Sequence, residues 1–225
     1  MSKEHKVTIK EIEAVTRNVG RFVTTKPKDF EFRPGQATEV AIAKEGWMDE
    51  KRPFTFTSLP NDPYLEFTIK IYPERDGVTD RLAELQVGEE LIIGEPWGAI
   101  EYQGPGVFIA GGAGITPFIS ILRDLEKKDK LEGNRLLFSN ETEDDVILAG
   151  EFRKMLGEKA LYTVTGETSA TYQEGRIDKE FLTGEIDHFD QYFYVCGPPE
   201  MVEDVKSFLS DLGADENHII HEQAA

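Results

Sequence analysis

A glycine-rich turn near the middle of the chain constrains the fold more than any other feature. The apolar run 106–110 leads into Gly-Gly-Ala-Gly-Ile-Thr-Pro-Phe at 111–118, and a helix-like run follows at 119–125. Glycines without Cβ let a phosphate approach the backbone, and a helix that begins near Thr116 directs free N–H groups at an anion. Pro117 replaces the third glycine of the full G-x-G-x-x-G pattern, so this turn alone is a weak signal.

Two further motifs lie on either side of this turn. Upstream the chain reads Arg-Pro-Phe-Thr-Phe-Thr-Ser at 52–58, and downstream it reads Cys-Gly-Pro-Pro-Glu-Met at 196–201. Together the three motifs resemble those of the ferredoxin-NADP reductase superfamily of flavoproteins, and the resemblance spans nearly the whole chain. In that family an Arg-Pro-Tyr-(Ser/Thr)-x-x-Ser strand holds the flavin, the glycine turn holds the nicotinamide pyrophosphate, and a Cys-Gly-Pro segment flanks the nicotinamide.

The order of strand and helix patterns predicts two domains, and 225 residues suffice for two cores. Residues 1–104 are expected to form an antiparallel β-barrel, which the resemblance assigns to flavin, and residues 105–225 an α/β domain for NAD(P). Six β-type runs favour the barrel: 6–12, 20–24, 37–43, 52–58, 65–72 and 90–93. Strands then alternate with helices, which indicates a doubly wound parallel sheet with ligands at the carboxyl ends of its strands. The expected strands are 107–110, 135–139, 160–165, 192–196 and 218–220, and the helices are 116–128, 148–155, 179–182 and 199–212.

The resemblance assigns the flavin to residues of the first domain. Arg52 offers a guanidinium fork suited to a phosphate, although an arginine at a barrel edge is the plainer alternative. Phe54 stands where the family has tyrosine, and Thr55 matches the hydroxyl that approaches flavin N5. The run 69–72 resembles the strand that contacts the ribityl chain and adenine, and a core strand explains its isoleucines equally well. The implied flavin-binding residues are Arg52, Pro53, Phe54, Thr55, Ser58, Ile69, Lys70, Tyr72, Gly77, Val78 and Thr79.

A short helix at 79–85 is a second candidate phosphate site. We expect Thr79 to be its N-cap, because a side-chain oxygen there accepts from the first free N–H groups. The segment Asp76-Gly77-Val78-Thr79 resembles the family element whose backbone amides bind the flavin pyrophosphate, with Asp76 where the family has glycine. A plain capped surface helix is the alternative.

The resemblance assigns the nicotinamide cofactor to the second domain. Cys196 resembles the family thiol that places nicotinamide C4 against flavin N5, and Glu222 resembles the family's C-terminal glutamate. An inert buried cysteine and an exposed chain end are the structural alternatives. The implied catalytic residues are Thr55, Cys196 and Glu222. The implied nucleotide-binding residues are Gly111, Gly112, Ala113, Gly114, Thr116, Pro117, Ser139, Glu141, Cys196, Gly197, Pro198 and Met201.

The segment after the second expected strand predicts a preference for NADH over NADPH. The adenosine ribose of doubly wound domains lies near this position, and residues 137–145 contain four acids and no Lys or Arg. A 2′-phosphate would meet repulsion there, whereas ribose hydroxyls can donate to a carboxylate. Arg153, Lys154 or Arg176 folding over the site would weaken this preference.

Composition excludes several other classes of protein. A single cysteine excludes an internal disulfide and a cysteine-ligated iron-sulfur cluster in this chain, and the four histidines lack metal-ligand spacing. The formal charge is −18, of which −5 falls in residues 1–104 and −13 in the rest, so nucleic acid is not an expected partner. A charged N-terminus without an apolar run predicts a cytoplasmic protein without a signal peptide, and no stretch is long enough to be a membrane anchor.

These observations predict a flavoenzyme reductase that takes a hydride from NADH, in preference to NADPH, onto bound FAD, in preference to FMN. Electrons would pass to a separate carrier such as a ferredoxin or flavodoxin, or to an oxygenase component. Two alternatives remain open, a non-catalytic flavin or nucleotide sensor subunit and a free-flavin reductase that uses flavin as a substrate.

Overall fold

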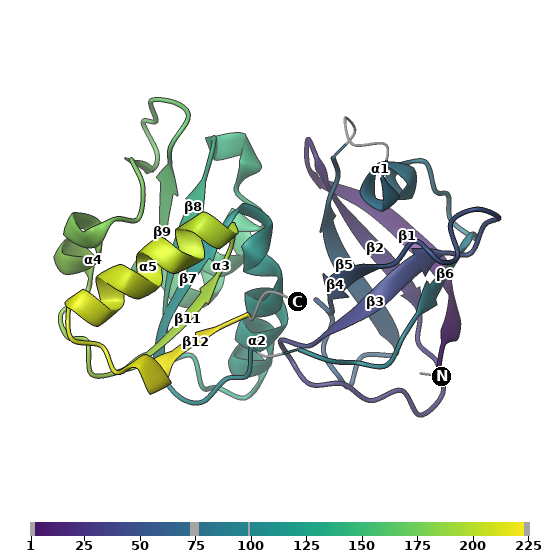
Figure 1. Ribbon diagram of the computed structural model, residues 1–225, viewed down its shortest axis with the longest axis horizontal. Coiled ribbons are helices and arrows are strands. Elements are labelled where there is room, and N and C mark those ends of the chain that lie inside the picture. The colour runs from purple at the N-terminus through teal and green to yellow at the C-terminus, as the bar shows by residue number, and fades with distance from the viewer. Residues whose placement is uncertain (1–2, 73–76, 99, 223–225) are drawn as a thin grey trace.

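The chain folds into two lobes, each built around its own sheet. The computed structural model describes residues 3–72, 77–98 and 100–222. Figure 1 shows the lobes side by side, with helix α2 (Thr116–Lys127) at the boundary between them. The predicted hydride transfer requires residues of both lobes, so their boundary decides whether the motifs meet.

The first lobe is the expected antiparallel barrel. Its strands are β1 (His5–Thr16), β2 (Val19–Thr25), β3 (Ala37–Ile42), β4 (Arg52–Thr55), β5 (Tyr64–Lys70) and β6 (Glu90–Ile93). They pair in the order β4-β3-β6-β1-β2-β5, and every neighbouring pair is antiparallel. A bridge between Phe56 and Phe67 joins the two ends of this sheet and closes it. Phe22, Phe56 and Phe67 fill the interior with side chains at most 2% exposed, so the barrel has an aromatic core.

Two local expectations in the barrel are corrected. Strand β4 ends at Thr55 instead of Ser58, because the chain turns from β3 toward β5 at Phe56. Helix α1 (Val78–Ala83) starts before Thr79, its N-cap is Gly77, and no side chain caps it, so the prediction that Thr79 is the N-cap is wrong. The reason is tertiary: Val78 is buried in the barrel core, which draws the first turn one residue earlier. Asp76 lies outside the described residues.

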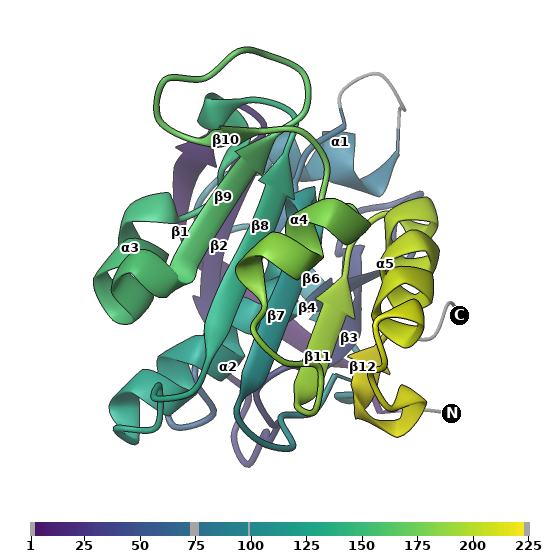
Figure 2. The same cartoon turned by 90° about the vertical axis from the view of Figure 1, so that its left-hand side faces the viewer.

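The second lobe is the expected parallel sheet. Its strands are β7 (Gly106–Gly111), β8 (Arg135–Asn140), β9 (Ala160–Val164), β10 (Gln173–Glu174), β11 (Tyr192–Cys196) and β12 (Ile219–His221). Their order is β10-β9-β8-β7-β11-β12, and all neighbours are parallel. Figure 2 shows α4 (Lys179–Glu185) and α5 (Pro199–Asp211) over one face, with α2 and α3 (Ala149–Leu156) on the other side. Short 3₁₀ turns complete it: η2 (Gly112–Ile115), η3 (Glu143–Asp145), η4 (Gly157–Lys159) and η5 (Glu216–His218).

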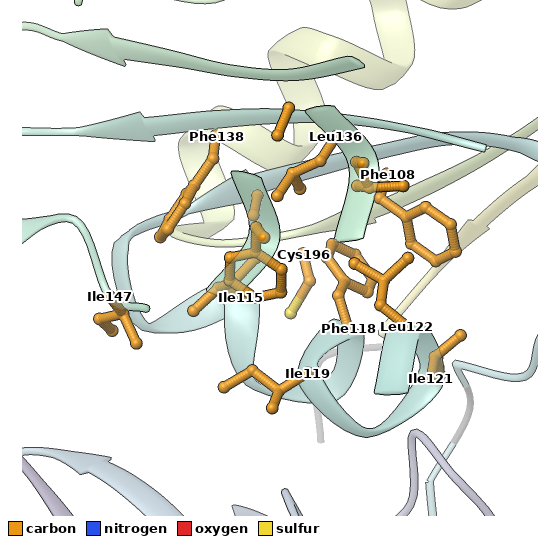
Figure 3. Packing of buried hydrophobic residues seen from close by; sticks show 14 of the residues in the cluster. Phe108, Ile115, Phe118, Ile119, Ile121, Leu122, Leu136, Phe138, Ile147 and Cys196 are labelled. Atoms are coloured by element: carbon orange, nitrogen blue, oxygen red, sulfur yellow. The ribbon is translucent and has the colours of Figure 1, made fainter. Parts of the chain in front are cut away.

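The boundary between the lobes is partly apolar and continuous with the core of the second lobe. Val19 of the barrel and Ile100 of the connecting segment belong to the same buried cluster as Phe118 and Leu122 of α2. Figure 3 shows Cys196 within this cluster, beside Ile115 and Phe118. Because the cluster crosses the boundary, the lobes are packed against each other through apolar side chains that are removed from water.

A buried carboxylate adds a polar connection at the same boundary. Glu66 on β5 has a 4% exposed side chain, and its Oε1 accepts from Arg123 Nη1 of α2 at 2.7 Å. Its Oε2 accepts from Arg21 Nε at 2.7 Å, and Thr57 Oγ1 donates to Oε1 at 2.9 Å. Arg123 also donates to both oxygens of Glu151 on α3, at 2.5 and 2.9 Å. We call Glu66, Arg123, Arg21, Thr57 and Glu151 the boundary network.

The boundary network makes the protein sensitive to acid. Burial alone would raise the pKa of Glu66, but the charge of Arg123 and the hydrogen bonds from Arg123, Arg21 and Thr57 outweigh it and lower that pKa below 4.5. A lowered carboxylate pKa stabilises the fold above pH 4.5, and this contribution is lost as the pH falls through the folded-state pKa. We expect Glu66→Gln to lower the free energy of unfolding at pH 7 by about 1.5–3 kcal/mol. Denaturant titrations should also give the variant a smaller loss of stability between pH 6 and pH 3 than wild type, and an equal loss would contradict this assignment.

Candidate functional site

The three sequence motifs meet in one cleft between the lobes. This central cleft has a volume of about 570 Å³. Its barrel wall is formed by β4, β5 and the start of α1, and its other wall by the two turns that follow β7 and β11. The lining residues that the sequence predicted are Pro53, Phe54, Thr55, Ile69, Lys70, Tyr72, Thr79, Gly111, Ala113, Gly114, Thr116, Pro117, Cys196, Gly197, Pro198 and Glu222. Predicted residues as far apart in the chain as Pro53 and Glu222, which are separated by 169 positions, therefore share one surface.

The glycine turn lets the ends of β7 and β11 approach closely. A Cβ on Gly114 would lie 2.3 Å from the carbonyl oxygen of Cys196 and 2.6 Å from Cα of Gly197. A side chain at this position is therefore excluded by backbone atoms, which cannot swing away as a side chain can. Gly112 differs, because it has φ +51° and open space where a Cβ would be. The turn thus combines a tight backbone contact on one side with an accessible backbone on the other, as a phosphate-binding turn requires.

Cys196 and Glu222 come together at the end of the sheet. Cys196 is the last residue of β11, and its Sγ donates to Glu222 Oε2 at 3.8 Å. Burial, and to a smaller extent the nearby Glu222 carboxylate, together raise the pKa of the Cys196 thiol to about 12. The thiol is therefore neutral near pH 7, which favours a packing role in the cleft and not a nucleophilic one.

We expect Cys196 to resist alkylation in the native protein. Iodoacetamide reacts with the thiolate, so a pKa of about 12 slows labelling at pH 7.5 by on the order of 1000-fold relative to a free cysteine. Mass spectrometry measures this directly, because the chain has one cysteine. Protein unfolded in urea is the control and should be labelled completely. Labelling of the native protein at the rate of the unfolded control would show that the thiol is exposed or ionised.

A second cleft of about 460 Å³, here called the side cleft, adjoins the first and shares Lys70, Gly111 and Pro198 with it. It lies at the carboxyl end of β8, where Ser139 and Glu141 line it as predicted, together with Gly112 and Met201. Asn140 also lines it, with a residue exposure of 5%, and neither atom of its amide has a partner among the described residues. A buried amide without a partner is costly, so this side chain fits a site that receives polar ligand groups.

Charged residues of both signs line the side cleft. The acids are Glu141, Asp145, Asp178, Glu200 and Asp204, and the bases are Lys70 and Arg176. Of the three basic residues that could weaken the preference for NADH, Arg153, Lys154 and Arg176, Arg176 lines this cleft. Arg153 instead lies over the rings of Tyr162 and Tyr172, at 5.5 and 5.9 Å from their centroids. Acidic groups nevertheless outnumber basic ones around the end of β8, which bears on the choice between NADH and NADPH.

Four predicted site residues lie outside the lining of both clefts. The Arg52 guanidinium donates to the carbonyl of Lys51 at 2.7 Å, and its side chain is 51% exposed. Ser58 is buried and accepts a hydrogen bond from the Glu66 amide at 3.0 Å. Val78 packs in the barrel core, and Gly77 precedes it at the N-cap of α1. Cofactor binding stays a prediction for these four residues, as it does for the residues that line the clefts.

Sequence reasoning missed several lining residues. In the central cleft these are Ala37, Thr68 and Pro199, and in the side cleft Asn140, Asp145, Thr165, Ile177, Asp178, Glu200, Asp204 and Phe208. Asn140 was accessible to sequence reasoning, since it directly follows Ser139 at the end of a predicted strand. Arg176 was named from the sequence only as one of three bases able to fold over the site. It stands in the loop between β10 and α4, and only the fold brings it to the cleft.

The described ranges contain neither a metal-ligand cluster nor a membrane-spanning helix. Within residues 3–72, 77–98 and 100–222 there is no group of three or more His, Cys, Asp or Glu side chains arranged to hold a metal ion. Among the helices that the structure describes, none is long and apolar enough to span a membrane.

Comparison with known protein families matches both lobes. Residues 4–105 match the FAD-binding domain model and residues 108–207 match the oxidoreductase NAD-binding domain model. The NADH-cytochrome b5 reductase 1 of Eremothecium gossypii is 31% identical over 196 residues, which cover 76% of this chain and 67% of that protein. The reductase component of the naphthalene 1,2-dioxygenase system of Pseudomonas putida, a ferredoxin--NAD(P)(+) reductase, is 27% identical over 224 residues, 95% of this chain and 67% of that protein.

A solved structure agrees in fold. The flavohem-like FAD/NAD binding domain of nitric oxide dioxygenase from Vibrio cholerae superposes with a TM-score of 0.83 at 21% identity, over 99% of this chain and 98% of that one. The chain spans about 55 to 67% of the length of the oxygenase reductase components that it matches. By both domain models and the cytochrome b5 reductase relative, the chain belongs to the ferredoxin-NADP reductase superfamily, with an FAD-binding domain followed by an NAD-binding domain.

Proposed function

We propose that the chain is an NADH-dependent flavoprotein reductase that delivers electrons to a separate acceptor. The observation that carries this proposal is the central cleft, which joins the Arg-Pro-Phe-Thr strand of the FAD-binding domain to both turns of the NAD-binding domain. FAD, when bound, accepts a hydride from NADH and releases its electrons to an acceptor. We take residues 1–104 and 105–225 as the two working domains.

We assign the flavin to the barrel wall of the central cleft. Phe54 and Tyr72 offer aromatic side chains for packing against the flavin ring, and Thr55 lines the same cleft with a hydroxyl. Lys70 and Thr79 supply a cation and a hydroxyl for the phosphate groups. Arg52 would join them only by leaving the Lys51 carbonyl that it now contacts. Phe54 lacks the phenolic hydroxyl of the family tyrosine, so the ring is held by packing alone at that position.

We assign NADH to the opposite wall and the side cleft. The backbone of Gly112 and Ala113 and the N-terminus of α2, a helix of 12 residues, suit the pyrophosphate. Ser139, Asn140 and Glu141 suit the adenosine ribose hydroxyls. Cys196, as a neutral thiol, packs beside the reacting ring, and Glu222 covers it from the chain end. Fixing the donor and acceptor rings in contact supplies several kcal/mol toward the hydride step.

The proposed electron acceptor is a separate protein. Relatives of this chain include reductase components of oxygenases and a cytochrome b5 reductase, and these support a separate protein acceptor. A ferredoxin, a flavodoxin or an oxygenase component fits this description. We also propose that the protein is located in the cytoplasm. Cell fractionation tests this, and the protein is expected in the cytosolic fraction.

The experiment is a spectroscopic titration of the purified protein. Flavin absorbance should persist through gel filtration, and anaerobic NADH should bleach it within seconds. Addition of ferredoxin, flavodoxin or cytochrome b5 should then restore the absorbance as the carrier is reduced. A protein that cannot be loaded with FAD or FMN would overturn the proposal. Flavin that elutes separately would favour a free-flavin reductase, and flavin that NADH does not bleach would favour a sensor.

A further inference from the structure

The boundary network differs from an ordinary surface ion pair. The side chains of Glu66, Arg123 and Glu151 are 4%, 22% and 28% exposed, and Arg123 engages Glu151 through two donors. Another pair across the boundary, Arg17 with Asp145, also has two donors and a buried carboxylate, but its arginine is 62% exposed and both contacts are 3.2 Å long. A guanidinium that faces water fixes the orientation of its partner less strongly than one that is mostly buried and shared between two carboxylates.

Arg123 connects two segments of the barrel to two helices of the other lobe. Besides Glu66 of β5, it donates to the backbone carbonyl of Thr57 at 2.8 Å. Arg123 is itself a residue of α2, and its hydrogen bonds to Glu151 connect α3 to the same guanidinium. Opposing effects act on its pKa: burial lowers it, and the hydrogen bonds and charges of Glu151 and Glu66 raise it above the ordinary value for arginine. The guanidinium therefore stays charged throughout the range in which the protein is folded.

The segments that Arg123 joins are the ones that continue into the central cleft. Thr57 lies two positions after Thr55, which lines the cleft. Glu66 is on β5, and the same strand continues to Ile69 and Lys70, which also line the cleft. Helix α2 begins at Thr116, seven residues before Arg123, which is about 10 Å along the helix axis at 1.5 Å per residue. Because strands and helices are stiff over such lengths, a change of angle at the network shifts one cleft wall against the other.

We propose that Arg123 is a positioning residue for hydride transfer. It lines neither cleft, so it would act by fixing the angle between the NAD-binding domain and the barrel, and thereby the distance between the two cofactor rings. This inference rests on the proposed function, since the rings occupy the two walls only if that function is correct. Misplacement of reacting groups by about 1 Å can cost about 100-fold in rate.

The test is stopped-flow reduction of the FAD-loaded protein by NADH over a range of NADH concentrations. Arg123→Ala is expected to lower the limiting rate about 10- to 100-fold while flavin content and the apparent Kd for NADH change little. Arg123→Lys keeps the charge but not the fork and should recover part of the rate. NADH deuterated at C4 should slow the limiting rate of the variant, which identifies hydride transfer as the affected step.

Arg135→Ala is the matched control. Arg135 has a 30% exposed side chain and pairs with Glu185, within the NAD-binding domain and away from both clefts. Its removal costs a similar ion pair without touching the domain boundary, so the limiting rate should equal that of wild type. Should Arg123→Ala fail to fold, Arg123→Lys and Glu66→Gln are measured in its place.

The outcomes separate the inference from the function on which it rests. A limiting rate in Arg123→Ala, or in both replacement variants, that equals the rate of the wild-type protein overturns the positioning role. Bleaching of the wild-type protein by NADH in the same experiment still supports the reductase function. Equal losses in Arg123→Ala and Arg135→Ala also overturn it, because they reflect stability and not orientation. Failure of wild-type protein to be bleached by NADH overturns both. A lower limiting rate with an unchanged Kd, confined to the boundary variants, is the result that supports Arg123 as a positioning residue.

Discussion

Gly114→Ala is expected to slow NADH-dependent flavin reduction by about 100-fold or more while leaving flavin bound. The added Cβ would lie 2.3 Å from the carbonyl oxygen and 2.5 Å from the carbonyl carbon of Cys196. Real contacts of this kind are longer, so the turn that carries Cys196 must move away from the glycine turn. Both turns line the NAD-binding wall of the central cleft, and neither belongs to the barrel wall that we assign to flavin. Stopped-flow bleaching by NADH and the flavin-to-protein absorbance ratio measure the two effects separately.

Gly150→Ala is the matched control for this substitution. Gly150 lies in α3, has no positive φ, and has nothing within 4 Å of an added Cβ. Gly150 is the second residue of α3, and alanine is favoured over glycine in helices by up to about 1 kcal/mol, so this variant should be at least as stable as wild type and equally active. Wild-type bleaching rates in Gly114→Ala would show that the approach of the two turns is not required for hydride transfer.

Wild-type protein is expected to prefer NADH over NADPH by at least about tenfold in kcat/KM. The end of β8 and its surroundings present Glu141, Asp145 and Asp178 to the side cleft, against Lys70 and Arg176. A 2′-phosphate would be repelled by about 1 kcal/mol for each close carboxylate in water-like surroundings, and by more where water is excluded. A factor of ten corresponds to about 1.4 kcal/mol, so two such carboxylates suffice. Steady-state kinetics with both cofactors at equal ionic strength give the ratio.

Glu141→Arg tests which residue sets this preference. Glu141 lines the side cleft directly after Asn140, so its replacement exchanges a repulsive charge for an attractive one at the expected ribose position. The ratio should move toward NADPH by about tenfold or more, because the charge at this position changes from −1 to +1. Glu158→Arg, in the 3₁₀ turn η4 just before β9 and outside both clefts, makes the same charge change as a control. A wild-type protein that prefers NADPH tenfold would show that Arg176 outweighs the acids.

The two-domain order was predictable because its signals are local. The alternation of strands and helices after residue 105 can be recognised from the spacing of apolar residues alone, and it predicts the parallel sheet that the structure shows. The short strand β10 was missed, since two residues cannot display a period. Thr79 was misassigned as an N-cap because the burial of Val78 in the barrel, a tertiary contact, set the first turn of α1.

Most of the central cleft was also predictable, although for a different reason. The resemblance predicted which short motifs form the site, and the fold brings Phe54, Gly114 and Cys196 to one surface. It did not locate Arg52, whose side chain reaches the Lys51 carbonyl in place of the cleft. A long side chain on an edge strand has several partners within reach, and the motif alone does not choose among them.

By itself, the sequence determined the elements, their order and the residue types at the strand ends, because turn chemistry and apolar periodicity act over a few positions. Only the tertiary structure decided that Arg123 meets Glu66, 57 positions away, and that Arg176 enters the side cleft beside Glu141. Such pairs depend on how two finished cores pack against each other. Charged side chains carry no period that records a distant partner, and a buried carboxylate such as Glu66 is tolerated only where that packing delivers its counter-charges.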